Sequence, residues 1–421
     1  MSTEDPKEKF RKNESGKRLT SIIMNDYLTL HQRASQGAFV VWIAIIVPAE
    51  IFAGFENVVY GVPESHAALC AGKGAGPLLC GKAEGHGYST DLCSYARIDI
   101  GTAFDGGKDS PTFGLPKPDL LISNNNNCSL LVKWFDVYHR VWGVPHLVLD
   151  IPFCYEDQTS NDFRYIMDQF GHLIRTVESL SGQRFDIEKA REAVQNSSEA
   201  LAEWKRFTDF ARHRPSGITA FDSFVQMAPI LTSRGTRQLA EHYRLLAEET
   251  GEQVRAGVFP VPDERYRLLW DNIAPWHQLR KMSSRLAGLG ANITCASYTY
   301  CIGALEGRYD PYEFDGTDPL AWLARLQNFS VCPHGLNLRG KAMREVIERN
   351  AIDGVVFASN RSCKVYSLMQ MDQMRRIRED LGIPCVMIDV DHADVRKYSE
   401  ETAFTRLEAL LEMIDARRAQ A

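Results

Sequence analysis

Two stretches of the chain follow one pattern, and this near-repeat constrains the fold more than any other feature. The first reads PDLLISNNNNCSLLVKWF, then GVPHLVLDI; the second reads IDGVVFASNRSCKVYSLMQ, then GIPCVMIDV. In each, an apolar run is followed by Ser-Asn, a cysteine, a helical stretch and a second apolar run. Strands joined through helices form parallel sheets with right-handed crossovers. The pattern predicts an α/β fold with two related doubly wound (Rossmann or flavodoxin-like) parallel-sheet domains.

The spacing of apolar residues divides the rest of the chain. Residues 1–36 are polar with helical periodicity and are expected to form an N-terminal helical arm. Residues 37–160 should form the first α/β domain, starting with a strand over 39–47 and a second over 57–62. Residues 161–262 are rich in Glu, Lys, Arg, Ala and Leu and should form a helical segment. Residues 263–421 should form the second α/β domain.

Composition and charge exclude several classes of protein. The 421 residues are 44% hydrophobic and 24% charged, as in ordinary globular proteins, and the net charge of −6 gives no attraction to nucleic acid or anionic membranes. The most apolar run, residues 38–47, is too short to span a bilayer as a helix. The first residues are charged and lack the apolar core of a signal peptide, so we expect a cytoplasmic protein.

Ten cysteines in a long cytoplasmic chain do not form a disulfide framework, because that compartment is reducing. Free cysteine is also a good small core residue. Seven of the ten are interpreted as packing residues: Cys70, Cys80, Cys154, Cys295, Cys301, Cys332 and Cys385.

The other three cysteines occupy positions that favour chemistry. Cys128 and Cys363 follow predicted strands at the carboxyl end of a sheet, where ligands bind in open parallel sheets. Both also begin a helix, whose dipole stabilises a thiolate, and Cys93 follows Ser-Thr-Asp in a similar helix-start setting. Three thiolates could converge on a soft metal centre or an iron–sulfur cluster. The spacing alone leaves open the alternative of three well-placed packing cysteines.

Absent motifs narrow the chemistry further. The sequence contains no G-x-x-x-x-G-K-S/T loop, so the chain is not expected to hydrolyse ATP itself. It also contains no C-x-x-C pair, which weighs against a zinc ribbon or a ferredoxin-type loop. The loop Asn124–Asn127 could be a plain polar loop, or its amides could donate hydrogen bonds to cluster sulfides.

Three stretches together resemble the 2-hydroxyacyl-CoA dehydratase / benzoyl-CoA reductase superfamily (the 2-hydroxyglutaryl-CoA dehydratase D-component family), most closely its alpha-type subunit. They are GHGYSTDLCSYARIDIG, PDLLISNNNNCSLLVKWF and the segment from IDGVVFASNRSCKVYSLMQ to LLEMIDARR. The resemblance implies a [4Fe–4S] cluster, or a related larger cluster, held by Cys93, Cys128 and Cys363, with one iron open to substrate. It also implies a related second subunit, in a heterodimer or higher assembly, and a separate ATP-dependent iron–sulfur activator.

The resemblance further implies a lyase that eliminates water from an (R)-2-hydroxyacyl-CoA. The thioester does not acidify the C3 proton, and in the family one electron entering the carbonyl forms a ketyl radical that expels the 2-hydroxyl group. Glu64 matches a carboxylate that lies near the substrate in dehydratases; alternatively, it is an acid that interacts with a helix dipole.

Two features of the sequence favour functions other than that of a dehydratase. Ile45 stands where dehydratase alpha subunits carry a serine, and the stretch ASYTYCIGALEGRYDPYEFDGTDPLAWLARL is closer to the benzoyl-CoA reductase side of the superfamily. A reductase of aryl- or acyl-CoA is therefore the second hypothesis. The others are an iron–sulfur electron-transfer protein without acyl-CoA chemistry and a non-redox α/β binding protein. The acyl group, the cluster type and the choice between homo- and hetero-oligomer do not follow from the sequence.

Overall fold

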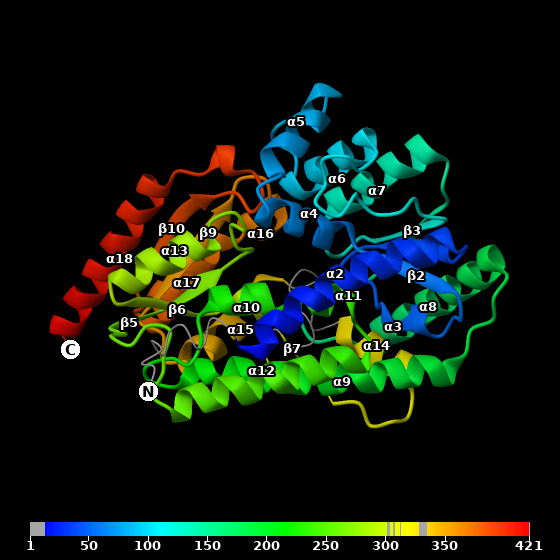
Figure 1. The fold of residues 1–421 in the computed structure, drawn as a ribbon. Coiled ribbons are helices and arrows are strands. Elements are labelled where there is room, and N and C mark those ends of the chain that lie inside the picture. Colours follow the sequence, from blue (N-terminus) through cyan, green and yellow to red (C-terminus); the bar gives the residue numbers. More distant parts are fainter. Residues whose placement is uncertain (1–12, 301–303, 306–307, 312, 328–334, 421) are drawn as a thin grey trace, which may run out of the picture.

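The computed structural model describes residues 13–300, 304–305, 308–311, 313–327 and 335–420. Two four-stranded parallel sheets, both flanked by helices, dominate the fold (Figure 1). The predicted α/β class with two parallel-sheet units is confirmed. The boundaries at 36/37, 160/161 and 262/263 stay a prediction.

The first sheet has the strand order β2-β1-β3-β4. Its strands are β1 (Phe39–Ile43), β2 (Val58–Gly61), β3 (Leu120–Asn124) and β4 (His146–Leu149). The helices of this part of the chain are α3 (Glu50–Ala53), α4 (Pro63–Gly72), α5 (Gly76–Gly85), α6 (Ser94–Asp105) and α7 (Ser129–Trp142). The strand predicted for residues 39–47 ends earlier, because a turn closed by the Val47 N–H and the Ala44 carbonyl follows it.

The second sheet has the order β10-β9-β5-β6. Its strands are β5 (Tyr266–Asp271), β6 (Ala291–Ala296), β9 (Gly354–Asn360) and β10 (Cys385–Val390). The helices associated with it are α13 (Leu279–Gly288), α15 (Leu336–Arg349), α16 (Lys364–Ser367), α17 (Gln370–Leu381) and α18 (Glu400–Gln420). Helix α14 (Pro319–Leu326) packs instead against α8 (Ser160–Ser181) and α9 (Ile187–Thr208), with its buried residues in the hydrophobic cluster of the first sheet. A short antiparallel pair is formed by β7 (Ala304–Leu305) and β8 (Arg308–Pro311).

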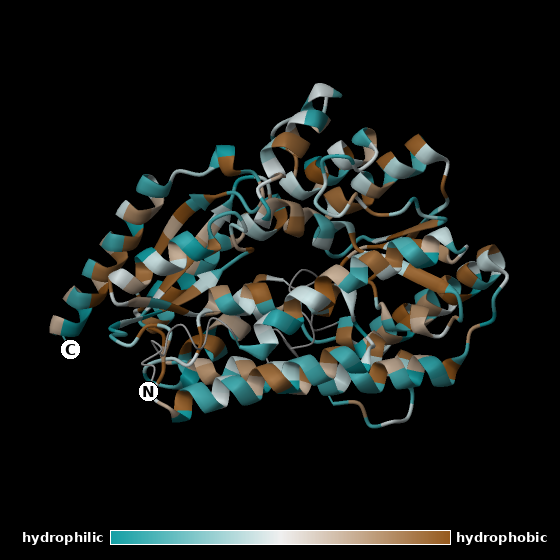
Figure 2. Cartoon of the chain, viewed as in Figure 1, coloured by the Kyte–Doolittle hydropathy of each residue, from teal (hydrophilic) through white to brown (hydrophobic). Residues whose placement is uncertain are grey.

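Both faces of the second sheet are covered, as a doubly wound sheet requires. Val356 and Ala358 of β9 belong to one hydrophobic cluster, which includes residues of α18. Val355 and Phe357 belong to another, which includes residues of α15 and α17. Successive side chains of a strand point to opposite faces, so each face packs against its own helices. The strands of both sheets are accordingly among the apolar parts of the chain in Figure 2.

The remaining helices lie beside the two sheets, with the long α9 and α12 along one side of the molecule (Figure 1). Trp204 of α9 and Tyr243 of α12 pack with ring centroids 5.0 Å apart. Within the described residues, no helix has both the length and the apolar character of a bilayer span. The helices of this group are α2 (Glu14–Ser35), α8 (Ser160–Ser181), α9 (Ile187–Thr208), α10 (Ala220–Gln226), α11 (Ala228–Thr232) and α12 (Arg237–Arg255).

Two glycines allow α5 to pack closely against its neighbours. A Cβ atom at Gly101 of α6 would lie 2.0 Å from the Leu79 carbonyl oxygen. One at Gly76 would lie 2.2 Å from the carbonyl oxygen of Ala393, which follows β10. Such distances exclude any side chain without movement of the backbone. The close approach brings the first part of the chain against the loop after β10.

Candidate thiol site and acyl cavity

Each of the three nominated cysteines is the residue immediately before a helix. Cys93 precedes α6, Cys128 precedes α7 and Cys363 precedes α16. Cys128 and Cys363 also come shortly after the carboxyl ends of β3 and β9. All three thiols thus lie at helix starts, as the sequence predicts, and two of them also lie at strand ends. Cys93 is itself the cap residue of α6, and the Ser-Thr-Asp run lies just before it.

The three cysteines also differ from the others in exposure. Cys93, Cys128 and Cys363 are half-buried. The other cysteines that the structure describes are buried, in agreement with a packing role: Cys70, Cys80, Cys154, Cys295 and Cys385. Cys301 and Cys332 lie outside the described residues. A thiol that must bind a ligand has to remain reachable, so exposure separates the two groups.

The electrostatics indicate that the three thiols lie near one another. Burial is the main effect that raises the pKa of each thiol, that of Cys363 to about 12. Charge on Cys363 and Cys128 raises the pKa of Cys93 further, and charge on Cys128 raises that of Cys363. Backbone N–H groups at the start of each helix oppose these shifts. A cationic centre between the thiols would lower their pKa values instead, because it stabilises thiolates.

The geometry bears on the kind of metal centre that would fit. Among the residues described, no three His, Cys, Asp or Glu side chains form a group that could hold a single metal ion. An iron–sulfur cluster makes a different demand, because each cysteine binds a separate iron of the cluster. Its ligand sulfurs therefore lie farther apart than those around one ion. Three half-buried thiols within electrostatic reach of one another fit that larger group.

The asparagine loop before Cys128 contains unpaired polar atoms. Asn124 donates through its Nδ2 to the Oδ1 of Asn126. The Oδ1 of Asn124 and the Nδ2 of Asn126 are buried and have no hydrogen-bond partner. A buried amide without a partner is costly, and a ligand can remove the cost. The orphaned N–H₂ group of Asn126 is a donor of the kind that cluster sulfides accept.

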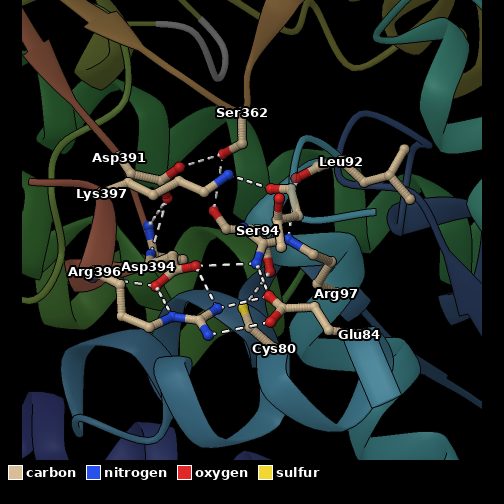
Figure 3. Close-up of polar contacts among 12 residues, drawn as sticks. Cys80, Glu84, Leu92, Ser94, Arg97, Ser362, Asp391, Asp394, Arg396 and Lys397 are labelled. Atoms are coloured by element: carbon tan, nitrogen blue, oxygen red, sulfur yellow. Dashed lines mark hydrogen bonds and ion pairs between the residues drawn. The ribbon is translucent and has the colours of Figure 1, made fainter. Parts of the chain in front are cut away.

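A buried polar network joins the segments that carry Cys93 and Cys363. Ser94 Oγ lies 3.1 Å from Ser362 Oγ, which donates to Asp391 Oδ2 at 2.7 Å (Figure 3). His392 Nε2 lies 3.0 Å from Ser94 Oγ and 3.6 Å from Cys93 Sγ. None of these four partners was predicted. The signal available in the sequence was the polar run Asp-His-Ala-Asp directly after an apolar strand.

Beside this network, an ion-pair cluster connects the same two parts of the chain. Arg97 of α6 is fully buried, and its Nη1 lies 2.6 Å from Glu84 Oε1 and 3.0 Å from Asp394 Oδ2. Arg396 bonds the same two carboxylates, at 2.6 and 2.7 Å (Figure 3). Burial alone would raise the pKa of Asp394, but hydrogen bonds from Arg396 and Arg97 lower it to about 2.

Glu64 lines a cavity of about 280 Å³ whose walls are mainly apolar and aromatic. It lies in the first turn of α4, and its Oε1 accepts a hydrogen bond of 3.1 Å from the Ile45 N–H. Its Oε2 is buried without a partner, and burial raises the pKa of this carboxyl to about 7. Ile45 lines the same cavity, as do Tyr95 and Trp276. Charge on Glu64 also raises the pKa of Cys128, so the cavity adjoins the thiols.

Two parallel sheets, three reachable thiols at helix starts and an apolar cavity with one carboxyl group define the chain as a two-sheet α/β protein with an enzyme-like site. A family model described as "2-hydroxyglutaryl-CoA dehydratase, D-component" matches residues 44–414, and the chain belongs to that family. It is similar to the (R)-phenyllactyl-CoA dehydratase alpha subunit of Clostridium sporogenes, with 32% identity over 91% of each chain.

Two other relatives mark the breadth of the family. The (R)-2-hydroxyisocaproyl-CoA dehydratase alpha subunit of Clostridioides difficile is 31% identical over 96% of this chain and 98% of its own. A subunit of the benzoyl-CoA reductase of Thauera aromatica is 28% identical over 87% of this chain and 86% of its own. The predicted membership is confirmed, and both branches that the residues suggested occur among the relatives.

Proposed function

We propose that the chain is the iron–sulfur subunit of an (R)-2-hydroxyacyl-CoA dehydratase and works with a related second subunit. The observation that carries the proposal is the set of three half-buried thiols, within electrostatic reach of one another, beside the cavity that contains Glu64. Cys93, Cys128 and Cys363 would hold a [4Fe–4S] or related cluster. A separate ATP-dependent activator would deliver the electron, in keeping with the absence of a P-loop.

When bound, such a cluster would supply the electron that reduces the thioester carbonyl. The ketyl radical of the substrate would then be able to expel the 2-hydroxyl group. The chain's own residues would do the rest. The apolar cavity excludes water from the acyl group. Glu64 has a pKa of about 7 and a buried, unpartnered Oε2, so it can accept a proton from the acyl chain or return one.

The cavity also favours a class of acyl group. Tyr95, Phe224 and Trp276 contribute aromatic walls, and Ile45 adds an aliphatic one. Such walls fit an apolar or aryl side chain better than a second carboxylate. We therefore propose an apolar 2-hydroxyacyl-CoA, of the size of a phenyllactyl group, as the substrate.

Ile45 supports a second candidate function, that of a benzoyl-CoA reductase-type subunit. Its apolar side chain lines the cavity at a position where dehydratase alpha subunits carry a serine. An aliphatic side chain cannot hydrogen-bond a substrate hydroxyl group, but it packs well against an aromatic ring.

The test separates the two chemistries with one preparation. The chain is purified anaerobically with its partner subunit and is assayed with activator, ATP and a low-potential reductant. With (R)-phenyllactyl-CoA we expect the unsaturated acyl-CoA to form without net consumption of electrons. Reduction of benzoyl-CoA with consumption of two electrons would favour the reductase instead. Turnover of neither substrate class by an iron-loaded complex would contradict both, and the electron-transfer alternative would then stand.

A further inference from the structure

Tyr95 brings a hydroxyl group to the wall of the acyl cavity, beside the thiol site. The residue lies in the first turn of α6, two positions after Cys93, and its side chain is buried. It lines the cavity together with Glu64 and Trp276. A single turn of helix therefore connects a nominated thiol with the cavity wall.

The hydrogen bonding of this hydroxyl group is incomplete. Trp276 donates through its Nε1 to Tyr95 Oη. An indole N–H can only donate, so the Tyr95 oxygen is the acceptor in this bond and its own hydrogen is not used. Among the residues that the structure describes, no acceptor receives that hydrogen. A buried donor without an acceptor is costly, and a ligand that supplies an acceptor removes the cost.

The Tyr95 side chain is held in place by segments from both sheets. Its ring packs edge-on against His392, which follows β10, with centroids 4.3 Å apart. Trp276 follows β5; its ring packs edge-on against Phe224 of α10 at 5.8 Å, and its backbone N–H donates to the His392 carbonyl at 3.1 Å. The hydroxyl group is thus positioned before a ligand arrives, and such preorganisation lowers the entropic cost of binding.

Tyr95 also lies near both reactive parts of the site. Burial is the main effect that raises the pKa of Tyr95 well above its usual range, and charges on Cys93, Cys363 and Glu64 raise it further. Electrostatic effects of this kind weaken with distance. Tyr95 is therefore close to the thiols and to Glu64, and its hydroxyl group is a donor at neutral pH.

The carbon chain of the proposed substrate has its reacting positions in a fixed order. C1 carries the thioester carbonyl, which must face the thiol site because the electron enters there. C3 carries the proton that Glu64 would accept. C2 lies between them and carries the hydroxyl group that leaves. A donor close to both the thiols and Glu64, as Tyr95 is, can therefore reach the 2-hydroxyl oxygen.

Ile45 supports this assignment. It stands where dehydratase alpha subunits carry a serine, and its side chain lines the cavity without any hydrogen-bonding group. Its backbone N–H already donates to Glu64 Oε1 at 3.1 Å. Ile45 therefore has no donor for a substrate hydroxyl group, and Tyr95 supplies one to the same cavity.

We infer that Tyr95 donates a hydrogen bond to the 2-hydroxyl oxygen of the acyl-CoA and so selects 2-hydroxy esters over esters that lack this group. The inference rests on the proposed function, since it names the residue that recognises the leaving group of that reaction. Tyr95 keeps its proton. Its hydrogen bond stabilises the negative charge on the oxygen as the C2–O bond breaks and the bonding electron pair moves to that oxygen.

The test is a calorimetric titration of two CoA esters into the anaerobic, iron-loaded complex with its partner subunit, without activator, so that no turnover occurs. (R)-Phenyllactyl-CoA carries the 2-hydroxyl group, and 3-phenylpropionyl-CoA is the same ester without it. We expect the wild type to bind the hydroxy ester about fivefold more tightly. Tyr95→Phe should bind the two esters equally, with unchanged affinity for 3-phenylpropionyl-CoA.

Tyr138→Phe is the matched control, because Tyr138 Oη also accepts a hydrogen bond from an indole, that of Trp134, at 2.7 Å. Tyr138 is fully buried and does not line the acyl cavity, so this variant should keep the preference for the hydroxy ester. Trp276→Phe removes the bond that orients the Tyr95 hydroxyl group and should reduce the preference although Tyr95 is intact. Iron content is measured on each variant, and Trp276→Phe carries the test if Tyr95→Phe loses its iron.

Other outcomes overturn the inference in distinguishable ways. A preference that survives in Tyr95→Phe refutes the assignment and leaves the proposed function standing. Equal weakening of both esters by Tyr95→Phe means that Tyr95 contacts a part of the substrate other than the hydroxyl group. A wild type without any preference shows that the site does not recognise the hydroxyl group. If the iron-loaded wild type binds neither ester, the proposed function itself fails.

Discussion

At the scale of single residues, Glu64 is the group whose environment departs most informatively from that of an ordinary side chain. Its carboxyl is buried, one oxygen has no partner, and its pKa is about 7. The folded protein therefore holds a proton that the unfolded chain releases near pH 4.5. Between pH 4.5 and about pH 7, unfolding releases this proton, so the unfolding free energy falls as the pH rises, and it levels off once the folded carboxyl also ionises. The full effect is about 3 kcal/mol.

Glu64→Gln removes this ionisation and should change how stability depends on pH. We expect the variant to gain about 3 kcal/mol of unfolding free energy relative to the wild type between pH 5 and pH 8. Denaturant unfolding of both proteins at the two pH values measures the difference. Parallel pH profiles for the two proteins would show that the Glu64 carboxyl is not protonated at neutral pH and would remove its proposed proton-transfer role.

At the scale of elements, the Arg97 ion-pair cluster holds α5 and α6 against the loop after β10. Arg97 has no exposed surface, and its loss would leave Asp394 buried with one partner fewer. Arg97→Met should therefore lower the unfolding free energy by about 3–5 kcal/mol. The matched control is Arg344→Met, which breaks the exposed pair with Asp380 and should cost less than about 1 kcal/mol. Equal losses in urea unfolding would mean that the cluster does not join the two parts of the chain.

The helices and strands of the near-repeat could be predicted from the sequence. A strand whose polar residue bonds groups far away in the sequence could not. The near-repeat located β3, β9 and the helices after Cys128 and Cys363. Strand β5 was missed because Arg267 interrupts its apolar run. That arginine is buried, and it bonds the carbonyls of Ala211, His213 and Asn350. Sequence periodicity cannot reveal such partners, because the fold alone brings them together.

The residues of the site also fall into a predictable group and an unpredictable one. Each cysteine could be nominated from its own surroundings, since a strand end or a helix start is a local feature. The orphaned Glu64 oxygen and the contact between His392 and Cys93 depend on several segments meeting in space. No single stretch of sequence carries those relations.

At the scale of the whole molecule, the thiol site is formed by residues from both parallel-sheet parts of the chain. Cys93 and Cys128 come from the first part of the chain and Cys363 from the second, and Ser94 and Ser362 bond across the junction. A cluster held there would depend on the relative placement of the two sheets. Several relatives are named as alpha subunits, so a partner subunit is part of the active assembly for which the chain is proposed.

The most direct measurement is the content of iron and acid-labile sulfide after strictly anaerobic purification with the partner subunit. It is made on the wild type, on Cys93→Ala, Cys128→Ala and Cys363→Ala, and on Cys154→Ala as the control for a buried packing cysteine. Circular dichroism confirms that each variant is folded. We predict that the wild type and Cys154→Ala hold iron and sulfide and that each of the other three loses them. An iron-free wild type, or a full complement of iron in all three variants, would contradict the account.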